Sequence, residues 1–323
     1  MRAAALVGLG LTLLRLSDYP AAAARLEEGL ALAQAAGERQ IEAAALTALG
    51  ETGWRQGAYD AAEQRLAAGL AAAQACGDQA GMALAAHQLG WVAYRRGQHA
   101  QAGRWAEESR TWYSEIGDRQ GIAAALNELG IIAFGQNEPA AAQRHFTASL
   151  TLCQAIGDRR GTANALNNLG MAASRQGAWE EERAYYEQCR GIYEEIGERA
   201  GVVIALLNLG ELCVDQGLDA EAWTYLRAAL REAVAIHTPL NVLYVLIQAA
   251  RLRYRAGASE RAAELLGLVL HHPASDSGIA QESAIETALA GLRQALPAAQ
   301  LEAALARGAG LDLAQVVAEI MVE

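Results

Sequence analysis

Apolar and small residues recur along this chain with a period of 40 residues. A Leu-Gly pair stands at the same place in six consecutive segments: Leu9-Gly10, Leu49-Gly50, Leu89-Gly90, Leu129-Gly130, Leu169-Gly170 and Leu209-Gly210. Each segment carries two stripes of apolar residues at helical spacing, which predicts a helical hairpin. The glycine of each pair lets the partner helix approach closely. Because such hairpins bury their apolar faces only against their neighbours, the pattern predicts a solenoid that binds a partner and does not catalyse a reaction.

The second segment shows the two helices and their ends. A first helix is predicted from Ile41 to Gln56, and Gly57 is expected to end it in a left-handed conformation. A second helix is predicted to begin at Asp60. Glycine followed by an acidic residue then separates this helix from the next, and Asp78 is expected to cap that next helix. The same pairing recurs along the chain as Gly77-Asp78, Gly117-Asp118, Gly157-Asp158 and Gly197-Glu198.

Three further kinds of residue repeat together with the Leu-Gly pair. They are an aromatic residue four positions after the glycine (Trp54, Tyr94, Phe134), a turn glycine (Gly57, Gly97, Gly177) and an alanine in the second helix (Ala62, Ala102, Ala142). In these residues the chain resembles the tetratricopeptide repeat, in a 40-residue variant found in peptide- and partner-binding scaffolds. The resemblance implies an all-α, right-handed superhelix in which residues 1–270 form seven hairpins.

The pattern changes towards the end of the chain. Ala249-Ala250 replaces Leu-Gly in the seventh segment, and residues 271–277 are predicted to be a polar loop. Residues 278–323 are predicted to form C-terminal capping helices. Within them, Leu301–Gly308 and Leu311–Val317 resemble the C-terminal end of large bacterial STAND-type ATPases and LuxR-like transcriptional regulators. That resemblance implies that the chain is the sensor or scaffold portion of a larger regulator.

Composition and charge narrow the classes of function. Of 323 residues, 53% are hydrophobic but only 6% are aromatic, which suits closely packed helices. The net charge of −11 argues against direct binding to nucleic acid or to an anionic membrane. All 26 basic residues are arginine, so neither a Schiff-base lysine nor the lysine of a nucleotide-binding loop is present. We expect no cofactor, and no apolar run approaches the length of a membrane span.

The sequence contains no recognisable catalytic or metal-binding spacing. The four cysteines lie in predicted helices as buried thiols without a Cys-x-x-Cys pair: Cys76, Cys153, Cys189 and Cys213. With no leader segment at the start of the chain, they predict a cytoplasmic protein. His271, His272 and Asp276 lack a fourth ligand for a metal. Glu180, Glu181 and Glu182 are interpreted as solvated charge at the start of a helix. These features predict a protein that is not an enzyme.

The beginning of the sequence predicts an uncovered solenoid end. Ala3-Ala4-Ala5-Leu6-Val7 starts directly in a first helix, without a capping residue. An apolar solenoid end normally needs a polar capping helix. We therefore expect either upstream helices or pairing between two copies of the chain at this end.

First helices line the concave surface of such arrays, so equivalent positions form ladders 40 residues apart. Two ladders are largely polar: Thr47, His87, Asn127, Asn167 and Leu207, then Ala48, Gln88, Glu128, Asn168 and Asn208, with Asn164 one turn earlier. An asparagine side chain both donates and accepts, so a row of them could bind the backbone of an extended peptide. Peptide-binding tetratricopeptide proteins use such a ladder. The alternative is that these residues bond across adjacent helices.

Apolar and basic ladders lie next to the polar ones. One is Glu51, Trp91, Ile131, Met171 and Glu211, and Trp91 is a candidate contact there. Another, Trp54, Tyr94 and Phe134, is more typical of packing between repeats. A broken arginine row could hold carboxylates but favours a structural role near helix ends: Arg15, Arg55, Arg95, Arg175 and Arg255.

The ladders together predict a groove for an extended peptide or protein segment. Its residues are His87, Gln88, Trp91, Arg95, Asn127, Glu128, Ile131, Asn164, Asn167, Asn168, Met171, Arg175, Asn208 and Glu211. The leading interpretation is a partner-sensing module of a larger regulator. The alternative is a structural module that only oligomerises and leaves the groove empty.

Overall fold

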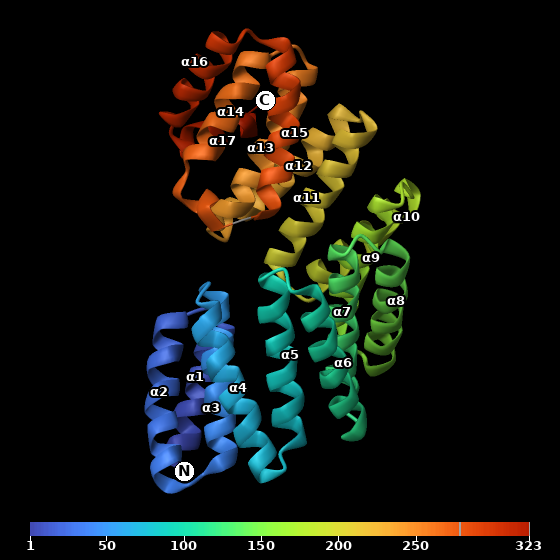
Figure 1. The fold of residues 1–323 in the computed structure, drawn as a ribbon. Helices are drawn as coiled ribbons and strands as arrows, with labels where there is room; N and C mark the ends of the chain where they lie inside the picture. The colour runs from blue at the N-terminus through green and yellow to red at the C-terminus, as the bar shows by residue number, and fades with distance from the viewer. Residues whose placement is uncertain (278, 323) are drawn as a thin grey trace. The chain divides into compact units, whose positions relative to one another are not determined.

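The computed structural model describes residues 1–277 and 279–322, without the side chains of residues 276–284. Within these residues the chain is a succession of α-helices with one short 3-10 helix (Figure 1). Its internal contacts divide it into two compact units, Met1–Gln176 and Gly177–Glu323. Among the described helices, none is both long enough and apolar enough to cross a membrane.

The first unit is a stack of helical hairpins. Its helices are α1 (Arg2–Arg15), α2 (Tyr19–Ala36), α3 (Arg39–Arg55), α4 (Tyr59–Cys76), α5 (Gln79–Arg95), α6 (His99–Glu115), α7 (Arg119–Gly135), α8 (Pro139–Ile156) and α9 (Arg159–Arg175). Within this unit, each helix packs against its neighbours in the sequence. The odd-numbered helices, which are the first helices of the repeats, also contact one another and form a continuous row that we call the odd-helix layer.

Glycine and aspartate set the helix ends, largely as the sequence predicts. Gly57 has a φ of 83°, which is the left-handed conformation that glycine adopts without strain. Asp78 accepts a hydrogen bond from the Gly81 backbone N–H at 3.0 Å, and Asp118 and Asp158 cap α7 and α9 in the same way. The prediction is wrong for Glu198, which makes no capping bond to α11. Its side chain has one more methylene than aspartate, the residue that suits this position.

The helical glycines of the Leu-Gly pairs face large side chains. An ideal Cβ built on Gly50 would overlap Leu66 of the following helix, and one built on Gly130 would overlap Phe146. At Gly90 the overlapping group is different, because the carboxylate of Glu128 from the next repeat takes up the space. The glycine at this position therefore makes room for a charged group.

The second unit consists of hairpins followed by terminal helices. It contains α10 (Trp179–Glu195), α11 (Arg199–Gln216), α12 (Asp219–Ala235), α13 (Pro239–Arg255), α14 (Ser259–His271), a 3-10 helix (Pro273–Ser277), α15 (Ile279–Ala295), α16 (Ala298–Ala309) and α17 (Leu313–Val322). One large apolar core joins α11, α12, α13, α14, α15, α16 and α17 and includes Leu226, Leu246, Leu266, Leu292 and Ile320. The helices α15, α16 and α17 cover this core.

Three local expectations are corrected by the structure. Residues 273–277 form a 3-10 helix where a loop was expected, and His272 accepts a bond from the Ala274 backbone N–H at its start. Cys76 is exposed because it is the last residue of α4. Glu182 is buried and is not solvated, because it stands where Ala62 and Ala102 face a neighbouring helix. Its neighbours Glu180 and Glu181 are exposed, as expected.

Candidate functional site

A cavity of about 260 Å³ lies at the odd-helix layer of the first unit, and we call it the first-unit cavity. It is lined by His87 and Trp91 from α5, Gln120, Ala123, Ala124 and Asn127 from α7, Ser149 and Cys153 from α8, and Asp158, Arg160, Gly161 and Asn164 at the start of α9. Gln120, Arg160 and Asn164 are exposed and form its rim, whereas Ser149 and Cys153 are buried and form its floor. Four residues of the predicted groove therefore meet at one cavity.

His87 is held between two neighbours in the cavity wall. Its Nδ1 lies 2.6 Å from Oε2 of Glu128, a carboxylate with no exposed surface. On the other side of the ring, Nε1 of Trp91 donates a hydrogen bond to Nε2 of His87 at 3.3 Å. Because Nε2 accepts a bond, the ring proton belongs on Nδ1, facing the carboxylate. The arrangement fixes the orientation of both His87 and Trp91.

The pair also shifts the acid-base behaviour of both groups. Burial acts to lower the pKa of His87, but the charge and hydrogen bond of Glu128, helped by Glu51, outweigh it and raise that pKa. Burial raises the pKa of Glu128, against the opposing effect of His87. The pair therefore holds protons more tightly than the two side chains would in water.

Trp91 also belongs to an aromatic cluster that joins α3 and α5. Its ring is stacked on Trp54 with centroids 6.2 Å apart, and it meets Tyr94 edge-on at 5.9 Å. Nε1 of Trp54 donates to Oε1 of Gln88 at 2.8 Å. Gln88 is buried beside Trp54, and Glu128 is buried beside His87. A ligand in the groove would therefore reach Gln88 and Glu128 only through their neighbours, contrary to the sequence-based interpretation.

The asparagine ladder is partly engaged within the protein. Nδ2 of Asn168 donates to Oδ1 of Asn127 at 2.8 Å, joining α9 to α7. Nδ2 of Asn167 lies 3.5 Å from Oδ1 of Asn168, and it also contacts the sulfur of Met171. These contacts match the cross-helix alternative, although Asn127 also lines the first-unit cavity.

The remaining groove residues lie elsewhere on the odd helices. Arg95 donates to the Tyr59 hydroxyl at 3.4 Å, and Arg175 lies over the Phe134 ring, 4.7 Å from its centroid. Both arginines thus join neighbouring repeats, which agrees with a structural role. Ile131 is half-buried and Met171 is exposed, both in the odd-helix layer. Asn208 and Glu211 belong to the second unit, on α11.

Reasoning from ladder positions missed two thirds of the cavity lining, because these residues lie outside the ladders. The missed residues are Gln120, Ala123, Ala124, Ser149, Cys153, Asp158, Arg160 and Gly161. One sequence signal was present. Cys153 stands where Tyr113 and Tyr193 occur one repeat earlier and later, so a large side chain is missing there.

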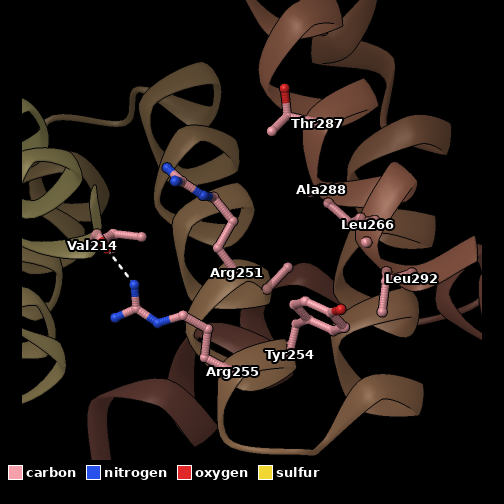
Figure 2. A pocket seen from close by; sticks show the side chains of 10 residues that line it. Val214, Arg251, Tyr254, Arg255, Leu266, Thr287, Ala288 and Leu292 are labelled. Atoms are coloured by element: carbon pink, nitrogen blue, oxygen red, sulfur yellow. Dashed lines mark hydrogen bonds between the residues drawn. The ribbon is translucent and has the colours of Figure 1, made fainter. Parts of the chain in front are cut away.

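A second cavity, of about 210 Å³, lies inside the second unit between α11, α13, α14 and α15 (Figure 2). Arg255 extends towards α11 and donates to the Val214 carbonyl, whereas Ala288 and Leu292 of α15 line the opposite side. The charged rim is already paired, since Arg251 contacts Asp215 at 2.5 Å. An ideal Cβ on Gly291 would lie 3.1 Å from Tyr254, so α15 packs closely against α13.

Metal-ligand geometry is absent from the described side chains. No group of three His, Cys, Asp or Glu residues among them could hold a metal ion. His271 contacts the Gly267 carbonyl through Nδ1 at 2.9 Å, and His272 caps the 3-10 helix. The side chain of Asp276, the third residue of the hypothetical set, lies outside the described residues.

Comparison with known proteins agrees with this architecture. A family model described as tetratricopeptide repeat matches residues 81–155 and 121–195. Comparison with curated proteins finds no match. Among solved structures, the chain is similar to a protein from Pyrococcus horikoshii. That protein is a Signal Transduction ATPase with Numerous Domains (STAND) protein with a tetratricopeptide repeat sensor. The TM-score is 0.66 with 13% identity, over 92% of this chain and 46% of that protein.

Two Rap protein structures are also similar. The apo form of RapI has a TM-score of 0.65 and 11% identity, over 89% of this chain and 100% of RapI. A Rap protein complexed with Competence and Sporulation Factor has a TM-score of 0.59 and 13% identity, over 95% of this chain and 99% of that protein. Residues 81–195 match the tetratricopeptide repeat model, and the predicted all-α solenoid of helical hairpins is confirmed.

Proposed function

We propose that this chain is a non-enzymatic scaffold that binds a protein segment or extended peptide on the odd-helix layer of its first unit. The observation that carries the proposal is the meeting of His87, Trp91, Asn127 and Asn164 at the first-unit cavity. A concave site with a few converging polar groups and a rigid aromatic side chain is typical of a binding pocket. Binding there would favour one arrangement of the repeats over others.

We further propose that the chain is the sensing module of a larger bacterial signal-transduction regulator in the cytoplasm. Two comparisons support this proposal. The similar STAND protein carries its tetratricopeptide repeats as a sensor, and a similar Rap protein is complexed with Competence and Sporulation Factor. These likenesses concern the fold, so the partner of this chain has to be identified by experiment.

In the second unit, one helix of the chain packs on a surface that is equivalent to the odd-helix layer of the first unit. Tyr254 occupies the ladder position of Trp54 and Tyr94, and α15 packs against it through Gly291. A helix of this chain thus covers a surface that corresponds to the odd-helix layer. This supports the proposal that the layer accepts a segment of another protein.

The proposal is tested by capturing partners from the source cytoplasm on the immobilised chain. A rim variant carries Gln120→Ala, Arg160→Ala and Asn164→Ala, all at exposed positions, so it should fold like the wild type. A control variant carries three exposed changes on even-numbered helices, Arg104→Ala, Glu108→Ala and Thr151→Ala. We expect the rim variant to lose a partner that the wild type and the control retain. Equal capture by all three proteins would contradict the proposal.

Self-association is a second candidate function, and one observation favours it. Leu9 of α1 is 48% exposed, whereas its equivalents Leu49 and Leu209 are 1% and 0% exposed. Leu49 packs against Val7 and Leu26 of the preceding repeat, so α1 presents a face that is buried at the next repeat. A second copy of the chain could cover this face.

Sedimentation at increasing concentrations tests self-association. If copies pair through α1, Leu9→Ser will shift the protein towards monomer. Leu84→Ser is the matched control, because Leu84 is also exposed, at 40%, on an odd-numbered helix. A wild-type protein that stays monomeric over the whole concentration range would contradict this candidate.

A further inference from the structure

The 40-residue register places tyrosine at two repeat junctions and cysteine at the junction between them. Tyr113 is followed eight residues later by Gly121, and Tyr193 in the same way by Gly201. At the junction between them, Cys153 replaces tyrosine while the glycine is retained as Gly161. At this junction a thiol therefore packs on the glycine in place of a ring, and Ala73 with Gly81 is a second pair without a ring.

The two tyrosines show what this glycine accommodates. An ideal Cβ on Gly121 would overlap the ring of Tyr113, and one on Gly201 would overlap the ring of Tyr193. Both rings are buried, with exposed fractions of 7% and 5%. The glycine thus provides the space in which a phenol ring lies flat against the backbone of the next helix.

The space at Cys153 is the floor of the first-unit cavity. Cys153 and Gly161 both line it, and Cys153 is 2% exposed. A cavity of about 150 Å³ in another protein takes up benzene. The 260 Å³ found here is therefore large enough for one aromatic ring.

Polar groups around Tyr113 are repeated around the cavity. Ser109 donates to the Ala83 carbonyl at 2.9 Å, and its equivalent Ser149 donates to the Ala123 carbonyl at 2.8 Å. Besides burial, Asp118 and Ser109 influence the pKa of Tyr113, and Asp158 and Ser149 influence the pKa of Cys153. Ser149 and Asp158 both line the cavity. The polar groups near Tyr113 are thus repeated at the cavity, where a small thiol stands in place of a phenol.

We infer that the first-unit cavity binds an aromatic side chain of the partner, and that tyrosine is its preferred occupant. The inference rests on the proposed function, because it supplies the residue by which a bound segment would be anchored. The ring lies against Cys153, whose Sγ packs beside Gly161 where the rings of Tyr113 and Tyr193 pack at their own junctions. Trp91 and His87 close the side of the cavity towards α5. A buried aromatic anchor of this kind dominates the affinity of many interfaces.

The first experiment uses p-cresol, the side chain of tyrosine, as the probe. Amide NMR shifts of the full chain are followed during a p-cresol titration. We expect saturable binding, with the largest shifts at Ala123, Cys153 and Gly161. Saturation at another surface, or no saturable binding at millimolar p-cresol, would overturn the inference.

A variant that restores the missing ring provides the matched test. Cys153→Tyr places in the cavity the residue that the chain itself uses at 113 and 193, so the fold should accept it. We expect this variant to melt no lower than the wild type and to bind p-cresol about tenfold or more weakly. Cys153→Ala leaves the cavity open and should bind p-cresol like the wild type. Equal p-cresol binding by Cys153→Tyr and Cys153→Ala would refute the inference.

A partner captured by the wild type separates this inference from the proposed function. If Cys153→Tyr loses the partner, and replacing one tyrosine of the partner by alanine has the same effect, both proposals are supported. If the rim variant loses the partner but Cys153→Tyr retains it, the odd-helix layer binds a partner without an aromatic anchor, and the inference alone is wrong. If p-cresol occupies the cavity but no captured partner depends on the rim, the proposed function fails by itself.

Discussion

Nδ1 of His87 on α5 lies 2.6 Å from Oε2 of Glu128 on α7, in the wall of the first-unit cavity. No other repeat carries this pair, since the ladder equivalents of Glu128 are Gly8, Ala48, Gln88, Asn168, Asn208 and Gln248. The contact joins two successive odd-numbered helices and, through His87, sets the position of Trp91. It therefore couples the protonation of a buried pair to the shape of the candidate binding site.

The first prediction concerns the response of Trp91 to acid. A second proton on His87 would occupy Nε2 and turn this acceptor into a donor, which breaks the hydrogen bond from Trp91. The pKa of His87 is raised above its ordinary value of 6.5 by Glu128. We expect tryptophan fluorescence to change with a midpoint above pH 6.5 as the pH falls, and Trp91→Phe to abolish the change.

Glu128→Gln is the control for this titration. Without the carboxylate, burial is opposed only by the smaller effect of Glu51, so the pKa of His87 is lowered and the fluorescence midpoint should move below pH 6.5. A midpoint that is the same in the wild type and in Glu128→Gln would show that another histidine is responsible.

The second prediction concerns stability as a function of pH. Both folded-state pKa values are raised, so the folded chain holds protons more tightly than the unfolded chain. The contribution of the pair is fully present below the ordinary glutamate pKa of 4.5 and is lost as the pH rises through the raised pKa of His87. As the pH rises from 4.5 to above 6.5, the ordinary pKa values of the two side chains, the unfolding free energy of the wild type should therefore fall relative to that of Glu128→Gln. Urea unfolding at a series of pH values measures the difference, and parallel curves would contradict the assignment.

The helices of this chain could be predicted from sequence far better than its candidate site. The predicted helix from Ile41 to Gln56 is observed as Arg39–Arg55, because apolar spacing and a turn glycine act within one segment. The burial of Glu128 could not be predicted in this way. It depends on Gly90, on a different helix, leaving room for the carboxylate. The first-unit cavity likewise depends on the pairing of Cys153 on α8 with Gly161 on α9, which a ladder along the odd helices does not contain.

The third prediction concerns the glycine of the Leu-Gly pair. A Cβ on Gly50 would overlap Leu66 and lie 3.2 Å from the Ala62 carbonyl oxygen, so α3 and α4 would have to separate. We expect Gly50→Ala to lower the unfolding free energy by about 1–3 kcal/mol. Gly103→Ala is the control, because a Cβ there meets nothing within 4 Å in the interior of α6. Alanine should stabilise that helix by about 0.5–1 kcal/mol. Thermal and urea unfolding compare the two variants, and a loss of stability of similar size in both would refute the packing explanation.

The fourth prediction concerns the crossing of α14 and α16 in the second unit. A Cβ on Gly308 would overlap the Glu264 carbonyl, and one on Gly267 would overlap the Leu305 carbonyl. Both obstacles are backbone atoms, which cannot turn aside as a side chain does, so Gly308→Ala should force α16 away from α14. Amide hydrogen exchange of α14 and α16 should then speed up strongly, while exchange in the first unit stays unchanged.

Gly310→Ala tests whether any change near the end of α16 has this effect. A Cβ on Gly310 has its nearest neighbour at 3.6 Å, an ordinary contact distance, and the φ of −94° suits alanine. Exchange in α14 should therefore remain slow in Gly310→Ala. If Gly308→Ala also leaves exchange in α14 slow, the two helices do not depend on glycine for their close approach, and the C-terminal cap is held by its apolar contacts alone.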